Sequence, residues 1–477
     1  EIGKIISNLG QVYANQGKYE QAKIKFQESL QISKAIKDIS GQASTLINLG
    51  ATYHSNHQLD KATESYQKSL KLAQSIKDNE LELKAWGNLG IAYEDLNDYP
   101  QAIKYFQKSL EIANKINNPK AQASTLNNLG HTLLKAGRLA EAEEKLRLSI
   151  KHLDKLRLGL SDAYKISIFD TQYHTYNLLQ QILVAANKPE AALEAAEQGR
   201  ARAFVDLLAN RTAKKISNSQ SFNINTNFSI KQIREIAKAQ NATLVEYTIV
   251  PADEFKHRGK LRTLAGEIYI WVVKPTGEVE LRRHKIERKI ALKTLVDSGR
   301  TCIIKDECRG NIEELIPSIG DTVKLKGNSQ NGWDVVNVDS INGKIFVIHP
   351  SWRKEEDWQP GDENDLAISY SISDVEAILN SSEAKKESLH QLHKLLIEPI
   401  ADILPEDPED RVIFLPQEDL FLVPFAALQD SKGGYLIKKH TILTAPSIQV
   451  MNFTRRLKNS VIKDNFKSAL VVGNPKM

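Results

Sequence analysis

The sequence predicts an α-helical solenoid followed by an α/β domain that carries a small β-rich insert. Three observations indicate this. The motif Asn-Leu-Gly recurs at residues 8, 48, 88 and 128, so the first part of the chain repeats every 40 residues, as stacked helical units do. Beyond residue 229, runs rich in Val, Ile and Tyr replace the helical period. Between 309 and 365, short alternating runs around glycine-containing turns are typical of a separate small β module.

Each 40-residue unit is predicted to form two helices. In the first unit Ile5, Leu9 and Val12 share a face of the first helix, and Ala22 and Phe26 lie on the apolar stripe of the second. Glycine within a helix costs about 1 kcal/mol relative to alanine. We therefore expect a close approach of a neighbouring helix backbone at the four mid-helix glycines, which are Gly10, Gly50, Gly90 and Gly130.

Composition excludes several classes of protein. The 477 residues are 41% hydrophobic and 26% charged with a net charge of +5, and the mixed charges argue against a dedicated nucleic-acid protein. No apolar run approaches the roughly 20 residues that span a bilayer, so no membrane partner is expected. The absence of a leader and the two cysteines fit a cytoplasmic protein. The chain starts inside a helical repeat and stops after a strand-like run, so we expect a fragment.

The repeated unit resembles the tetratricopeptide repeat in a 40-residue form. The resemblance is carried by the Leu-Gly-x-x-Tyr cores that begin at Leu9, Leu49 and Leu89, and it assigns residues 1–160 to an array of four repeats. In the fourth repeat Leu133 replaces the tyrosine. Such arrays form a curved surface whose concave side is lined by the first helices. The resemblance implies that a protein or peptide binds in this groove.

An asparagine precedes each Leu-Gly pair and forms a predicted ladder along the groove. A carboxamide both donates and accepts hydrogen bonds, so it can hold the backbone of an extended peptide. The alternative is that these asparagines bond to the neighbouring helix and only fix the stacking. The candidate peptide-binding residues are Asn8, Asn48, Asn88, Asn128, Gln11, His54 and His131.

Residues 161–210 are predicted to form a terminal helical hairpin, and the Ser- and Asn-rich stretch 211–228 a linker. From 229 to 477 the order of strands and helices resembles the N-terminal part of a CHAT domain, a caspase-like family. Its most specific matches are Leu422–Phe425, Ala445–Ser447 and Val471–Pro475. The segment 309–365 departs from that pattern, and its tryptophans are either a module core or a second binding patch.

The resemblance implies a cysteine peptidase with a His and Cys dyad. In the family both residues lie downstream of the strand matched by Val471–Pro475, so no residue here inherits a catalytic role. Cys302 and Cys308 are interpreted as ordinary thiols, and their spacing fits no structural zinc site. No metal and no cofactor are expected. The predicted function is a peptide-binding scaffold coupled to a caspase-like module in a bacterial sensor or signalling protease. The alternative is an interaction scaffold with a pseudo-peptidase module.

Overall fold

The computed structural model describes residues 2–158, 162–200, 228–251, 265–286, 292–304, 322–325, 333–339, 344–348, 368–371, 375–378 and 381–452. The chain divides into two compact units. The first comprises Glu1–Asn227 and Phe255–Arg262, and the second comprises Phe228–Glu254 and Thr263–Met477. The predicted linker at 211–228 therefore lies outside the described residues, apart from Phe228.

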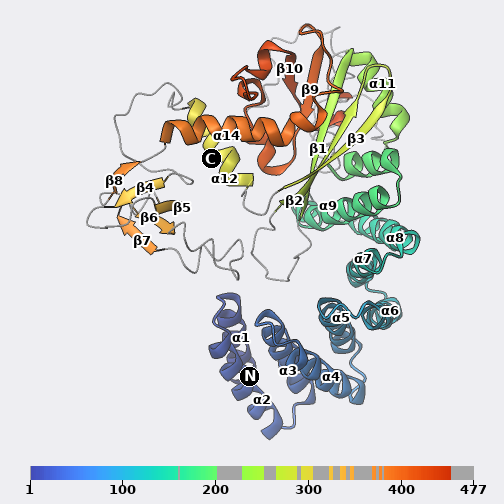
Figure 1. Cartoon of the computed structure of the whole chain (residues 1–477). Helices are drawn as coiled ribbons and strands as arrows, with labels where there is room; N and C mark the ends of the chain where they lie inside the picture. Colours follow the sequence, from blue (N-terminus) through green and yellow to red (C-terminus); the bar gives the residue numbers. More distant parts are fainter. Residues whose placement is uncertain are drawn as a thin grey trace, which may run out of the picture. The chain divides into compact units, whose positions relative to one another are not determined.

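In the first unit α1 to α8 form four successive helix pairs, and α9 follows them, as Figure 1 shows. They are α1 (Ile2–Asn15), α2 (Tyr19–Ala35), α3 (Ile39–Ser55), α4 (Leu59–Ser75), α5 (Asn79–Asp95), α6 (Tyr99–Lys115), α7 (Pro119–Lys135), α8 (Leu139–Leu158) and α9 (Asp162–Ala185). After a turn at residues 186–188, residues 189–200 are again helical. Each of α1 to α8 packs on the next, and each odd-numbered helix also contacts the following odd-numbered one. The first helices of the repeats thus form one side of the stack.

The turns between these helices recur at a fixed spacing. A residue with left-handed backbone stands at every twentieth position from Gly17 to Gly137. This backbone conformation lets the amide of the next residue donate a hydrogen bond to a carbonyl in the last turn of the preceding helix. Asp38 N, for example, donates to the Ser33 carbonyl of α2 at 2.8 Å. Side chains at the starts of α3, α5, α6 and α7 then accept from the first helical turn, which satisfies orphan amide groups. This local chemistry sets where each helix begins and ends.

The repeated glycines face the interior, as expected, but a different group fills the space beside them. A Cβ added at Gly90 would lie 2.7 Å from two ring atoms of Phe106, and one at Gly50 would lie 2.5 Å from the Tyr66 ring. At Gly10, Gly50 and Gly90 the three nearest atoms all belong to an aromatic side chain of the second helix, so the expected helix backbone is not the closest group there. At Gly130 a backbone atom of the second helix, the Ala142 carbonyl oxygen, lies 3.5 Å from the added Cβ. In the fourth repeat Leu146 takes the place of the ring.

Buried serines fasten the two helices of each repeat. Ser69 Oγ donates to the Ala43 carbonyl at 2.8 Å, and the same bond joins residues 26 positions apart in the other three repeats. Ser29 also lies 3.2 Å from Thr45 Oγ1 in the next repeat, and Ser109 lies 3.3 Å from Thr125 Oγ1. One position therefore contributes both to the repeat and to two of the junctions between repeats.

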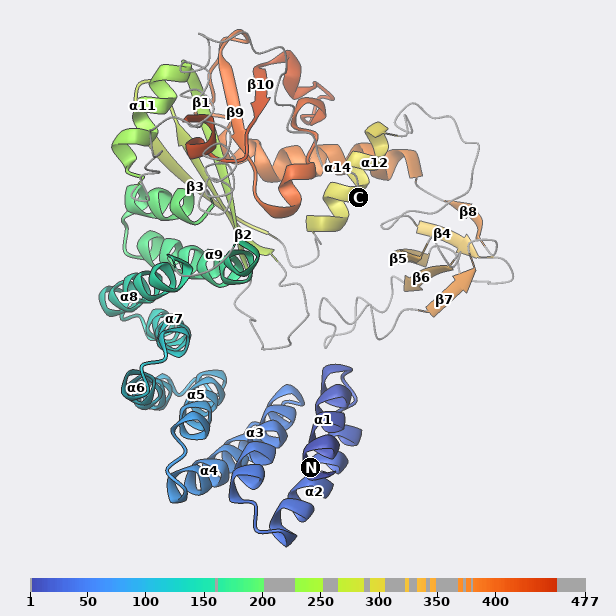
Figure 2. The same cartoon turned by 180° about the vertical axis from the view of Figure 1, so that it is seen from behind.

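The second unit contains a five-stranded mixed sheet with the order β10-β9-β1-β2-β3. Its strands are β1 (Ala242–Pro251), β2 (Ala265–Val273), β3 (Val279–Lys285), β9 (Arg411–Leu415) and β10 (Thr441–Thr444). β1, β9 and β10 are parallel, and β1, β2 and β3 are antiparallel. Figures 1 and 2 show α11 (Ile230–Gln240) on one side of this sheet and α12 (Leu292–Ile304) and α14 (Ser381–Leu396) on the other.

The core of this unit lies between the sheet and the helices α12 and α14. Tyr247 is fully buried in it, and Phe414 and Phe425 stack with their ring centroids 4.4 Å apart. Trp271 on β2 is also fully buried but does not belong to this cluster. Short 3-10 turns at Glu398–Ile400, Glu418–Leu422, Phe425–Ala427 and Leu436–Lys438 connect the later elements. Tyr247 on β1 donates a hydrogen bond to the Leu396 carbonyl at 3.0 Å, which ties the sheet to the end of α14.

A second, antiparallel sheet has the order β7-β6-β5-β4-β8. It comprises β4 (Thr322–Leu325), β5 (Trp333–Asp339), β6 (Lys344–Ile348), β7 (Ile368–Ser371) and β8 (Val375–Ile378). β7 pairs with β6 and β8 pairs with β4, so this sheet extends past residue 365, where the sequence pattern placed its end. Trp333 is buried in the core of the sheet, while Trp352 and Trp358 lie outside the described residues.

Candidate peptide-binding site

The asparagine ladder lies on the first helices of the four repeats. Asn8 is exposed, and Asn48, Asn88 and Asn128 are half-buried. Each asparagine is followed two residues later by the buried glycine of the same Asn-Leu-Gly motif, so both recur every 40 residues. The helix therefore fixes the glycine of each motif against a side chain of the second helix, an aromatic ring in three repeats and Leu146 in the fourth, and leaves the asparagine near the surface.

The asparagines differ in their partners. Asn48 Nδ2 donates to Ser7 Oγ across the first junction at 3.4 Å, which is a long hydrogen bond. The residues equivalent to Ser7 in the next two repeats are Ile47 and Gly87, and neither side chain can accept such a bond. Within the part of the chain that the structure describes, no hydrogen bond engages the carboxamide of Asn88 or Asn128. The exposed Asn8 forms none in the described structure either, so Asn48 is the one member of the ladder whose carboxamide is hydrogen-bonded there.

The two candidate histidines bind acidic residues of the neighbouring first helix. His54 Nε2 on α3 lies 2.7 Å from Asp95 Oδ2 on α5. His131 Nδ1 on α7 lies 2.7 Å from Glu94 Oε1 on α5, and the other Glu94 oxygen accepts a hydrogen bond from Thr132. These contacts join three consecutive repeats. Their geometry gives His54 and His131 a role in holding the first helices together.

Gln11 is bonded within its own helix, since its Nε2 donates to Asn15 Oδ1 at 3.1 Å. Glu94, Asp95 and Thr132 were not among the residues predicted from the sequence. A signal for the acidic pair was present, because both residues stand at the last turn of α5, one repeat along from His54 and Ser55. A histidine in one repeat and carboxylates at the corresponding positions of the next repeat are placed to meet across the junction.

The described part of the second unit contains buried titratable groups. His393 on α14 is 6% exposed, and His440 before β10 is 8% exposed. Burial lowers the pKa of both imidazoles. Cys302 lies in α12 without a described side chain, and Cys308 lies outside the described residues, as do the matched residues Val471–Pro475. Within the described residues, no group of three His, Cys, Asp or Glu side chains is placed to hold a metal ion.

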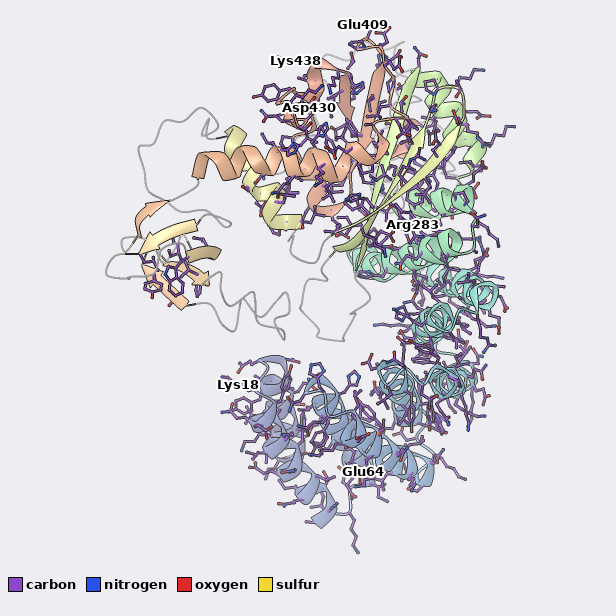
Figure 3. All side chains as sticks on the ribbon, in the orientation of Figure 1. Lys18, Glu64, Arg283, Glu409, Asp430 and Lys438 are labelled. Atoms are coloured by element: carbon purple, nitrogen blue, oxygen red, sulfur yellow. The ribbon has the colours of Figure 1, made fainter. Side chains whose placement is uncertain are left out.

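Several charged residues of the second unit form ion pairs at its surface. Arg283 on β3, labelled in Figure 3, donates two hydrogen bonds of 2.9 Å to Glu267 on β2. Asp430, also labelled there, accepts from the amides of Lys432 and Gly434 and from Lys439 Nζ, and these donors hold its pKa well below the ordinary value. These contacts stabilise turns and strand pairs. In the described part of the chain, no helix is both long and apolar enough to cross a membrane.

Comparison with known proteins identifies both regions. The tetratricopeptide repeat family matches residues 1–75 and 81–155, and the CHAT domain matches residues 386–477. Tetratricopeptide repeat protein 28 is 26% identical over 387 residues in the Homo sapiens form and 24% identical over 392 residues in the Mus musculus form. Each alignment covers 73% of this chain and 15% of the relative, so the chain spans only a small part of these proteins. Both relatives are mammalian, and a bacterial origin stays a prediction.

Two solved structures were also similar to the chain. BtubC (BKLC) from P. vanneervenii has a TM-score of 0.36 and 20% identity, covering 45% of this chain and 82% of that one. The apo form of RapI has a TM-score of 0.38 and 15% identity, covering 50% of this chain and 88% of that one. The periodic helices and the family matches therefore agree: this chain carries an array of tetratricopeptide repeats followed by a CHAT domain.

Proposed function

We propose that the first helices of the repeats bind an extended peptide, with the carboxamides of Asn88 and Asn128 as its principal hydrogen-bonding partners. The supporting observation is that both groups are half-buried without a hydrogen bond in the described structure, whereas Asn48 is bonded to Ser7. Neither carboxamide is enclosed by the protein, so a ligand can reach both of them. A peptide backbone supplies both the donor and the acceptor that each carboxamide lacks.

The surroundings of these two asparagines suit a backbone ligand. Gly87 stands where Ser7 stands in the first repeat, so the position next to Asn128 carries no side chain. Absent side chains allow another backbone to come close. The contacts of His54 with Asp95 and of His131 with Glu94 hold α3, α5 and α7 in register on both sides of Asn88. A preorganised groove loses less free energy on binding.

The experiment uses residues 1–477 and a short peptide selected on that protein from a randomised display library. The variant Asn88→Ala/Asn128→Ala should bind the peptide roughly tenfold or more weakly, since each lost hydrogen bond contributes about 1 kcal/mol. Fluorescence anisotropy measures the affinity. The matched control is Gln67→Ala/Gln107→Ala, which removes two exposed amides from the second helices α4 and α6 and should leave the affinity unchanged.

Asn48→Ala provides a third comparison. Because Asn48 already has a partner in Ser7, its loss should weaken peptide binding less than the loss of Asn88 does. Equal affinities for the wild type and the Asn88→Ala/Asn128→Ala variant, with normal helicity, would show that the ladder serves only the stacking.

We also propose that peptide binding in the array regulates the caspase-like CHAT module, as in a signalling protease. The support is the occurrence of both regions in one chain. Hydrogen exchange of the β1 and β9 amides, measured with and without the selected peptide, tests the coupling. Exchange that changes only in α1 to α9 would favour a scaffold without such regulation.

A further inference from the structure

Residues 428–440 form a loop that packs against α14 and leads directly into β10. The two sides of the loop are joined by a backbone hydrogen bond, because Leu436 N donates to the Leu428 carbonyl at 2.9 Å. Both leucines are buried in the core of the second unit. His390 Nδ1 of α14 lies 3.3 Å from the carbonyl oxygen of Gln429, so the loop also contacts the helix. We call residues 428–440 the pre-β10 loop.

Two buried histidines belong to the contact between this loop and α14. His393 lies on α14, and His440 is the last residue of the loop. The Nδ1 atom of each imidazole is enclosed and has no hydrogen-bond partner among the described residues. A protonated imidazole donates from both ring nitrogens, so a proton at either Nδ1 would be buried without an acceptor. The closed loop therefore favours the neutral form of both histidines.

The charged groups that act on these imidazoles do not offset that effect. They are, for His393, Glu398 in the 3-10 turn after α14, Asp430 and Lys439 on the loop and His390 on α14, and, for His440, Lys439. Asp430 is already bound, since Lys439 Nζ donates to its carboxylate at 2.7 Å and two backbone amides of the loop donate to it as well. Its negative charge is therefore largely balanced before either histidine takes a proton.

These conditions make the closed loop sensitive to protons. Burial lowers the pKa of both histidines, and Lys439 acts in the same direction on each. An imidazole that reaches water binds a proton near pH 6.5. Below that pH an open form of the loop binds more protons than the closed form, so the closed form loses stability as the pH falls through about 6.5. Each histidine that becomes charged on opening can raise the open fraction about tenfold at pH 5.5.

The loop and β10 are connected without an intervening residue. β10 begins at Thr441, directly after His440, and pairs with β9 through four residues. Elements with few pairings can open locally while the rest of a domain stays folded. We propose that His393 and His440 form a proton-sensitive latch, so that the pre-β10 loop leaves α14 and β10 separates from β9 as the pH falls below about 6.5. This proposal does not depend on peptide binding by the array.

Hydrogen exchange of residues 1–477 at about pH 7.5 and about pH 5.5 tests the latch, after correction for the intrinsic effect of pH on exchange. Mass spectrometry follows peptides covering 428–446 and 242–249. The first contains the amides of Leu436 and Ala445, which donate to the Leu428 and Phe414 carbonyls, and its open fraction should rise about tenfold or more at the lower pH. The second covers most of β1 and should not show this rise. No rise in the first peptide overturns the proposal, and an equal rise in both overturns it because the whole unit then unfolds.

Lys439→Gln tests the charge arrangement at an exposed residue. The substitution frees the Asp430 carboxylate and removes the positive charge that acts on both imidazoles, so the rise between the two pH values should be severalfold smaller. The matched control is Lys432→Gln, because the exposed Lys432 contacts Asp430 through its backbone amide. This control should keep the full rise. A full rise in Lys439→Gln overturns the proposal.

The histidines themselves are tested by His393→Gln/His440→Gln, which leaves nothing to protonate at either position. This variant should lose the rise, whereas the control His284→Gln on β3 should keep it. Circular dichroism at about pH 7.5 establishes that each variant is folded, and Lys439→Gln decides the question if the buried substitutions unfold the protein. A folded double variant that keeps the rise overturns the assignment of the latch to these two residues.

Discussion

Gly90→Ala and Gly87→Ala are expected to have opposite effects, although both residues lie in α5. In an open helical position alanine is more favourable than glycine by about 1 kcal/mol. At Gly87 the nearest atom to an added Cβ is Ser109 Oγ at 3.6 Å, an ordinary contact, so the substitution should stabilise the array by about that amount. At Gly90 the added Cβ would lie 2.7, 2.7 and 2.8 Å from three ring atoms of Phe106.

The Phe106 ring is 1% exposed and has little freedom to move away. Overpacking of a core costs about 1 to 3 kcal/mol, and three contacts of this length place Gly90→Ala near the upper end. After the gain in helix propensity, a net loss of about 2 kcal/mol remains. Urea unfolding followed by far-ultraviolet circular dichroism, with hydrogen exchange of the α5 and α6 amides, measures both variants. A Gly90→Ala protein as stable as Gly87→Ala would refute the role assigned to the aromatic ring.

Two further predictions concern the second unit. Tyr247→Phe removes the donor to the buried Leu396 carbonyl and should lower the free energy of unfolding by about 1 to 2 kcal/mol; a change of a few tenths in urea unfolding would contradict this. Burial lowers the pKa of His393 in the folded protein, so the unfolded chain binds more protons once the pH falls below about 6.5. The unit should therefore lose stability as the pH drops from neutral through that value, and His393→Leu should weaken the dependence; hydrogen exchange of the β9 amides at several pH values would show whether it does.

The repeats could be predicted from the sequence because several structural features recur with the same period. The spacing of 40 residues located the helix pairs, the buried glycines and the surface position of the asparagines. It did not show that a phenylalanine or tyrosine ring fills the space beside Gly10, Gly50 and Gly90, since periodicity gives the face of a helix but not the atoms opposite it. The pairing of His54 with Asp95 was also missed, because it joins two different residue types found in one repeat each.

In the second unit the sequence indicated where strands lie, but it did not indicate which segments they contact. The hydrogen bond between Tyr247 and Leu396 joins residues 149 positions apart, and no local pattern encodes such a distance. β7 and β8 were left out of the β insert because each has only four residues, too few to show an alternation. Their membership follows from backbone pairing with β6 and β4.

The hydroxyl contacts between repeats are unevenly distributed, and this bears on how the array can bend. Ser29 meets Thr45, and Ser109 meets Thr125. At the middle junction the corresponding residue is Ala85, whose methyl group has no directional preference for the facing Ser69. Helices in contact through a methyl group can slide without breaking a directional bond. A change in curvature between α4 and α5 would act on the contact of His54 with Asp95, which crosses this junction. It would alter the spacing between Asn48 and Asn88, whereas Asn88 and Asn128 both lie beyond the junction and would keep their spacing.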